Sequence, residues 1–214
     1  MKYKNILWDW NGTLTDDLDI ALEAVNIMLE RRKLPIITLE QYYTYITTPI
    51  IGFYEKCFDM TKDSEKTLLP EYQSEYRNLA KTLPKNDETF DTVKRLNLMG
   101  VRQFVVSSCE EAYLLEEIKK YKIDCFLECV TGAPNIRAES KVSRAKKLMD
   151  TYGLVPSETV FIGDTAHDLE TARAIGVDCI LVTFGHQFHK KDKKTGCVIA
   201  DSLCEIADYF KSDL

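Results

Sequence analysis

Short hydrophobic runs that end in polar or glycine residues recur along the chain. Four of them are Ile6–Trp8, Phe104–Val106, Val160–Ile162 and Ile180–Val182. Apolar runs of this length, bounded by polar residues, predict buried strands. The segments between the later runs have helical spacing, and strands that alternate with helices form parallel sheets covered on both faces. We therefore predict an α/β fold with a Rossmann-like parallel sheet, whose reactive groups lie at the carboxyl ends of the strands.

Local signals place several element boundaries in the second half of the chain. A further strand is predicted over Leu127–Thr131, and Gly153 follows an amphipathic helix as its stop residue. Ser108–Glu111 and Ser202–Glu205 have the spacing of capping boxes, so each is predicted to begin a helix.

The interval between the first two strands is much longer than one crossover helix requires. It has helical periodicity instead, with Thr38 capping the second of three predicted helices and Pro70 starting the third. We therefore predict a helical subdomain at residues 16–83, the helical insert. It interrupts an α/β core domain made of residues 1–15 and 84–214.

Composition narrows the class of protein. The 214 residues include 28 Lys and Arg against 34 Asp and Glu, a net charge of −6, which disfavours nucleic-acid binding through bulk positive charge. No apolar stretch has membrane length and no signal-peptide core is present, so a cytoplasmic protein without membrane association is expected. Seven cysteines, an odd number, argue against a disulfide framework. The sequence does not indicate an oligomeric state.

Polar residues that suit one reaction follow the predicted strands. Asp9 and Ser107 follow the first two, and Asp164 and Asp168 flank the start of a helix after a later strand. A carboxylate before a glycine turn is held near backbone N–H groups, which suits a phosphate, and carboxylates are typical Mg²⁺ ligands. Lys141 could balance their charge. Each fragment alone is also explained as an ordinary turn, cap or surface lysine.

Together these residues resemble the four motifs of the haloacid dehalogenase-like hydrolases, and closely those of phosphoglycolate-phosphatase-like members with a helical cap. The matching segments are Ile6–Leu14 (ILWDWNGTL), Phe104–Ser108 (FVVSS), Lys141 and Val160–Asp168 (VFIGDTAHD). The resemblance covers nearly the whole chain. It implies a magnesium-dependent phosphomonoester hydrolase that acts on a small phosphorylated metabolite, with the helical insert as a mobile cap that supplies selectivity.

The resemblance also implies roles for individual residues. Asp9 would be the nucleophile that forms an aspartyl-phosphate. Asn11 would occupy the second catalytic position, two residues after the nucleophile. Expected Mg²⁺ ligands are Asp9, Asn11 through its backbone carbonyl, Asp164 and Asp168. Expected substrate-binding residues are Thr13, Ser107, Ser108, Lys141 and Gly52.

One departure from the family concerns catalysis. The position two residues after the nucleophile is usually a second Asp that acts as general acid and base, whereas this chain has Asn11. Loss of such a group typically costs about 10²–10⁴ in rate. His167 or a side chain of the helical insert could replace it, the substrate could need little protonation, or the position could be an engineered trap. A weakly active phosphometabolite-binding or regulatory protein, and a phosphotransferase or mutase, remain alternatives.

A second departure is Val142, which stands where phosphoglycolate-type members often have Pro. Arg137 is an alternative phosphate ligand, although a solvated loop is the preferred interpretation. The run Lys190–Lys194 is also interpreted as a solvated loop. His186 and His189 could form a metal pair but are interpreted as surface residues.

Selectivity is expected to reside in the helical insert. The segment Thr47–Phe53, which contains Gly52, resembles the loop that faces the active site in capped relatives. The insert is also rich in tyrosines, most of which are expected to pack between helices: Tyr42, Tyr43, Tyr45, Tyr54, Tyr72 and Tyr76.

Overall fold

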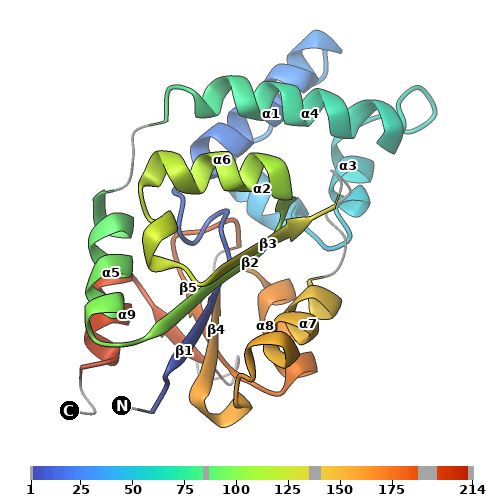
Figure 1. The fold of residues 1–214 in the computed structure, drawn as a ribbon. Coiled ribbons are helices and arrows are strands. Elements are labelled where there is room, and N and C mark those ends of the chain that lie inside the picture. The colour runs from blue at the N-terminus through green and yellow to red at the C-terminus, as the bar shows by residue number, and fades with distance from the viewer. Residues whose placement is uncertain (1, 84–86, 135–140, 188–196, 212–214) are drawn as a thin grey trace.

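A six-stranded parallel sheet forms the centre of the molecule (Figure 1). The structure, a computed structural model, describes residues 2–83, 87–134, 141–187 and 197–211. The strand order is β3-β2-β1-β4-β5-β6. The strands are β1 (Asn5–Trp8), β2 (Arg102–Glu110), β3 (Cys129–Ala133), β4 (Thr159–Gly163), β5 (Asp178–Val182) and β6 (Val198–Ala200). The predicted α/β parallel-sheet fold is confirmed.

Helices cover both faces of the sheet because successive strand residues point to opposite sides. In β1, Ile6 and Trp8 join one buried cluster and Leu7 joins another. The first cluster is closed by α5 (Asp87–Leu98), α6 (Glu111–Tyr121) and α9 (Leu203–Tyr209). The second is closed by α7 (Val142–Tyr152) and α8 (Ala166–Ile175). Short 3₁₀ turns, η1 (Asp124–Phe126) and η2 (Pro156–Glu158), precede β3 and β4.

The helical insert contains four helices and lies beyond the carboxyl ends of the strands (Figure 1). They are α1 (Leu18–Arg31), α2 (Leu39–Tyr45), α3 (Ile51–Cys57) and α4 (Glu65–Ala80). Their apolar faces pack into a cluster of their own, separate from the two clusters of the sheet. None of the helices in the described part of the chain is long and apolar enough to cross a membrane.

Two of the predicted helix starts are correct. Thr38 and Gln41 form a full capping box at α2. The Ser202 side chain accepts a hydrogen bond from the Glu205 N–H at the start of α9. Gly153 also ends α7 in the left-handed conformation, as predicted, with φ of 61°. All seven cysteines are free thiols, as expected.

Other predicted boundaries are wrong. Pro70 lies inside α4, which begins at Glu65 after a capping box made by Ser64 and Thr67. The burial of neighbouring apolar side chains offsets the hydrogen bond that proline cannot donate. Ser108 caps no helix, because β2 continues to Glu110 before α6 begins. β3 begins two residues later than predicted.

Candidate active site

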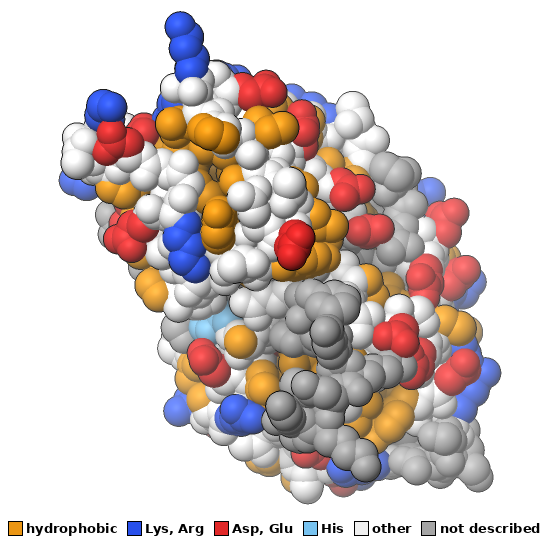
Figure 2. Space-filling model, turned by 180° about the vertical axis from the view of Figure 1, so that it is seen from behind, with side chains coloured by type: hydrophobic (Ala, Val, Ile, Leu, Met, Phe, Trp, Pro, Cys, Tyr) orange, Lys and Arg blue, Asp and Glu red, His pale blue; other side chains and the backbone are white. Residues whose placement is uncertain are grey.

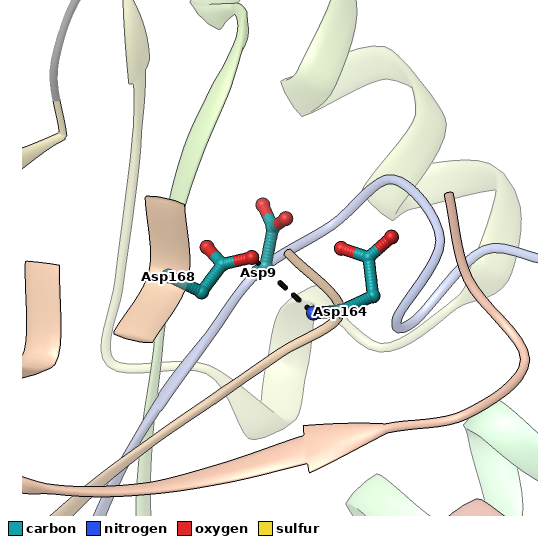
Figure 3. Close-up of side chains that lie close together, drawn as sticks. All are labelled: Asp9, Asp164 and Asp168. Carbon is teal, nitrogen blue, oxygen red and sulfur yellow. Dashed lines mark hydrogen bonds between the residues drawn. The ribbon is translucent and has the colours of Figure 1, made fainter. Parts of the chain in front are cut away.

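Three buried aspartates meet at the carboxyl ends of two neighbouring strands (Figure 3). Asp9 follows β1, Asp164 follows β4 and Asp168 lies in the first turn of α8. Since β1 and β4 are paired in register, with Trp8 opposite Ile162, the two strands end side by side. Carboxylate oxygens of the three aspartates all lie within 4.8 Å of one another. The strand-end clustering expected from the sequence is therefore present.

Glycines allow this close approach. At Gly12, where φ is +68°, a Cβ atom would lie 2.2 Å from Asp164 Oδ2. At Gly163 a Cβ atom would lie 2.3 Å from Asp168 Cγ. Any larger residue would push the carboxylates aside, so both turns require glycine.

Hydrogen bonds fix the orientation of Asp168. Its Oδ2 accepts from the backbone N–H of Asp164 at 3.2 Å, drawn as the dashed line in Figure 3, and from the N–H of Thr165 at 3.0 Å. The Thr165 hydroxyl donates to the same oxygen at 2.6 Å. The other carboxylate oxygen is left to face Lys141.

Lys141 joins two of the aspartates. Its Nζ lies 2.7 Å from Asp9 Oδ1 and 2.6 Å from Asp168 Oδ1, with the side chain only 4% exposed. Burial opposes the charge of the amine, but Asp168 and Asp9 outweigh it and raise the pKa of Lys141. The same ion pair overcomes burial to lower the pKa of Asp168. Burial and the nearby Asp168 raise the pKa of Asp9 to about 6 despite the lysine.

The cluster fits a divalent cation. Burial raises the pKa of Asp164 to about 8, with Asp168 and Asp9 adding repulsion and His186 opposing it. Three carboxylates and one lysine leave an excess of negative charge in a buried place. Hard carboxylate oxygens are the donors that Mg²⁺ prefers, and a cation would relieve the repulsion between them.

Asp164→Asn is expected to stabilise the metal-free protein at neutral pH. The pKa of Asp164 is about 8 in the folded protein and about 3.9 in the unfolded chain. Its contribution to the free energy of unfolding is therefore fully present below pH ~4 and is lost as pH rises to ~8. An amide avoids this loss. We expect the melting temperature of the variant in EDTA to exceed that of the wild type at pH 8, and to do so by a smaller margin at pH 5.

With Mg²⁺ the wild type should have the higher melting temperature of the two proteins, because an ion that binds only the folded state stabilises that state. Titrating Mg²⁺ at pH 8 should raise the melting temperature of the wild type much more than that of Asp164→Asn. The exposed Asp150→Asn in α7 serves as the control and should behave as the wild type. Equal melting temperatures for all three proteins, with and without Mg²⁺, would remove Asp164 from the metal site.

The predicted substrate-binding residues lie at different distances from this cluster. The Thr13 hydroxyl is buried and has no hydrogen-bond partner within the described residues. Ser107 is buried and its Oγ accepts from the Cys109 N–H at 3.1 Å, while Ser108 lines the cavity above the aspartates. Gly52 lies in α3 and is not among the residues that line this cavity. Arg137 lies outside the described residues.

Asn11 is held by hydrogen bonds that the sequence did not suggest. Its Nδ2 donates to Asp17 Oδ2 at 2.7 Å and to the Tyr76 hydroxyl at 2.9 Å. Tyr76 in turn donates to the same Asp17 oxygen at 2.7 Å. Asp17 directly precedes α1 yet does not cap it, because its carboxylate accepts from the Gly12 N–H at 2.7 Å instead. The amide of Asn11 is therefore fixed in place.

The interpretation of His186 as a surface residue is wrong. Its side chain is 13% exposed, and Nε2 lies 3.2 Å from Asp17 Oδ1. Its Nδ1 lies 3.0 Å from the Tyr42 hydroxyl, and its backbone N–H donates to Asp164 Oδ2 at 2.6 Å. Although burial acts in the opposite direction, Asp17 raises the pKa of His186 to about 9. His189, the other half of the suggested pair, lies outside the described residues, as does Lys190–Lys194.

These contacts connect the helical insert to the sheet. Tyr42 and Tyr76 come from α2 and α4, whereas their partners His186 and Asn11 follow β5 and β1. Figure 2 shows a histidine side chain at the surface where the insert meets the lower part of the molecule. His167 also lines the cavity, and burial with the nearby Lys141 lowers its pKa, which favours the neutral ring.

A cavity of about 220 Å³ lies between the insert and the sheet. Its floor includes Asp9, Asn11, Lys141 and Asp164. The cavity therefore places a small ligand directly on the aspartate cluster.

The chain is similar to several known proteins in sequence and in fold. A phosphoglycolate phosphatase from Pseudomonas putida is 22% identical over 92% of this chain and 76% of its own length. A 5′-nucleotidase from Pseudomonas aeruginosa is 27% identical over 86% of this chain and 85% of its own. The crystal structure of a haloacid dehalogenase-like family hydrolase from Streptococcus pneumoniae superposes with a TM-score of 0.82 at 18% identity, covering 97% of this chain and 98% of that one.

The family pattern described as haloacid dehalogenase-like hydrolase matches residues 6–182, a segment that holds β1 through β5 and all of the aspartate cluster. The chain therefore belongs to the haloacid dehalogenase-like hydrolases.

Proposed function

We propose that the protein is a magnesium-dependent phosphomonoester hydrolase that acts on a small phosphorylated metabolite through an aspartyl-phosphate. The observation that carries this proposal is the buried contact of Asp9, Asp164, Asp168 and Lys141 at the floor of one cavity. The relatives named phosphoglycolate phosphatase and 5′-nucleotidase support this substrate class. A cytoplasmic location remains a prediction from the sequence.

In the first step a carboxylate oxygen of Asp9 attacks the phosphorus. A new P–O bond to Asp9 forms, and the ester P–O bond breaks to release the alcohol oxygen with its electron pair. Lys141 sits beside Asp9 and balances the charge of the approaching phosphate, and Thr13, Ser107 and Ser108 are the proposed hydrogen-bond donors. Bound at Asp9, Asp164, Asp168 and the backbone carbonyl of Asn11, Mg²⁺ would supply further neutralisation of charge.

In the second step water attacks the phosphorus of the aspartyl-phosphate. The bond from phosphorus to the Asp9 oxygen breaks, which restores the carboxylate and releases inorganic phosphate with the proton from water. Asn11 can orient a ligand through its amide but cannot transfer a proton. Asn11 therefore assists neither protonation of the leaving group nor activation of water.

The helical insert, residues 16–83, would act as the cap over the core formed by residues 1–15 and 84–214. The contacts of Tyr42 with His186 and of Tyr76 with Asn11 support a closed arrangement that limits the entry of water. Asn11 is the observation that favours the second candidate, a phosphometabolite-binding protein with little turnover.

Release of phosphate from p-nitrophenyl phosphate and acetyl phosphate tests the proposal. We expect release that is at least about 100-fold faster with Mg²⁺ than with EDTA, because the cation offsets repulsion between the anions. Binding of phosphate esters without magnesium-dependent release from either activated substrate would instead support the second candidate.

A further inference from the structure

The wall that the helical insert presents to the cavity is mostly apolar and aromatic. It includes Tyr42, Ile46, Ile50, Tyr54, Leu69 and Tyr72, with Thr47, Thr48 and Gln73 as uncharged polar members. The insert is described without a gap from residue 16 to residue 83, and none of its residues that line the cavity is Lys or Arg.

This wall disfavours a negatively charged leaving group. The charged insert residue that lines the cavity is Asp17, a buried carboxylate. A carboxylate on the substrate would lose its hydration at this wall, where the nearby cation His186 is already paired with Asp17, so its burial is costly. The hydroxyls of Tyr42 and Tyr76 are engaged with His186 and Asp17. An uncharged aromatic group suits these surfaces better than an acid.

The size of the cavity limits the ligand. A volume of about 220 Å³ is below the roughly 300–1,000 Å³ of typical small-molecule sites. With Asp9 only 5% exposed under the insert, a compact group attached to the reacting phosphate fits this cavity best. One ring next to the phosphate is compatible with this volume.

Asn11 points independently to the same class of substrate. An alkyl ester leaves as an alkoxide, about as basic as hydroxide, whose parent water has a pKa of about 16. A phenolic ester leaves as a phenolate, whose parent has a pKa of about 10. A phenolate can depart without first being protonated. A site that holds the amide of Asn11 in place of a general acid therefore slows phenolic esters less than alkyl esters.

We propose that the substrate is a small aryl phosphate monoester with an uncharged aromatic group, bound with its ring against the insert wall. This inference rests on the proposed function of the same site. The ester P–O bond breaks as the Asp9–phosphorus bond forms, the phenolate takes a proton from solvent, and water then releases phosphate from Asp9. The products are a phenol and inorganic phosphate.

A panel of four esters separates the effects of an aromatic ring, of a negative charge and of the basicity of the leaving group. Phenyl phosphate has all the proposed features, benzyl phosphate keeps the ring but leaves as an alkoxide, 4-carboxyphenyl phosphate adds a charge, and 2-phosphoglycolate has the charge without the ring. We expect kcat/KM for phenyl phosphate to exceed that for 2-phosphoglycolate by at least about 100-fold. The values for benzyl and 4-carboxyphenyl phosphate should each be at least tenfold lower than for phenyl phosphate.

A matched pair of variants tests the wall itself. Ile50 lines the cavity and its neighbour Ile51 does not, although both are partly buried in the insert. Ile50→Lys should lower kcat/KM for phenyl phosphate about tenfold or more and raise the relative rate of 4-carboxyphenyl phosphate. Ile51→Lys should leave the ratio of the two rates unchanged. The same change in both variants would remove the wall from substrate selection.

Binding distinguishes a wrong substrate class from a wrong function. Calorimetry with Asp9→Asn and Mg²⁺ should show tighter binding of phenyl phosphate than of 2-phosphoglycolate. If no ester is hydrolysed but this preference remains, the proposed hydrolase fails and the aryl preference survives. Equal or reversed preference, in binding or in turnover, would overturn the inference. A tyrosine-phosphorylated peptide hydrolysed faster than phenyl phosphate would overturn the assignment to a small molecule.

Discussion

Asp9→Asn should lower the rate of phosphate release by at least about 10⁴-fold, because the amide cannot attack phosphorus as a carboxylate does. The substitution keeps the size of the side chain, and its carbonyl oxygen can still accept a hydrogen bond from Lys141 Nζ, 2.7 Å from Oδ1 in the wild type. The fold should therefore survive. The measurement is steady-state release of phosphate from p-nitrophenyl phosphate with Mg²⁺, alongside the melting temperature.

A covalent adduct gives an independent readout of the same role. After incubation with acetyl phosphate and an acid quench, mass spectrometry of the wild type should find a phosphoryl group on the peptide that contains Asp9. Hydroxylamine should remove it, as it does from acyl phosphates. The exposed Asp16→Asn is the control and should retain both adduct and activity. Wild-type activity in Asp9→Asn would exclude Asp9 as the nucleophile.

Lys141→Met should damage both stability and activity. Removing the amine leaves Asp9 and Asp168 buried without their shared cation, and breaking a buried ion pair typically costs about 3–5 kcal/mol. The melting temperature in EDTA should fall by roughly 6–20 °C. The rate of phosphate release should fall by about 10²–10³-fold, the usual effect of losing a group that stabilises developing charge.

The pH dependence identifies the cause of this loss. In the wild type the pKa of Asp9 is about 6 with Lys141 present, and it should rise when the lysine is removed. At low pH the carboxylates are protonated and repel little, so the stability deficit should shrink as pH falls toward 4. Lys146→Met, an exposed lysine of the same helix, should change stability by less than about 0.5 kcal/mol. A pH-independent deficit would point to lost packing rather than unpaired charge.

The sheet and the aspartate cluster could be predicted because their signals are local. A buried parallel strand is a short apolar run, and the residue that follows it lies at a known edge of the sheet. Asp9 and Asp164 were found in this way, and Lys141 by its place at the start of a helix. None of these three predictions required knowledge of contacts between distant segments, apart from the parallel arrangement of the strands.

The contacts around Asn11 could not be predicted because they join segments far apart in sequence. Asp17 resembles an ordinary residue at a helix start, and His186 stands next to a lysine-rich stretch that suggested a surface. Their burial depends on how the helical insert sits on the sheet, which hydrophobic periodicity does not report. The available signal was the position of Asp17, a carboxylate only three residues beyond the first motif.

The separate packing of the helical insert has a consequence for how this protein could diversify. All buried members of the insert cluster come from the insert itself except Tyr113 of α6. Substitutions at wall residues such as Ile46, Ile50 and Leu69 can therefore accumulate without repacking the sheet that holds the aspartates. A chimaeric protein that grafts another insert onto this core would have to keep Asp17, Tyr42 and Tyr76, because they contact Asn11 and His186.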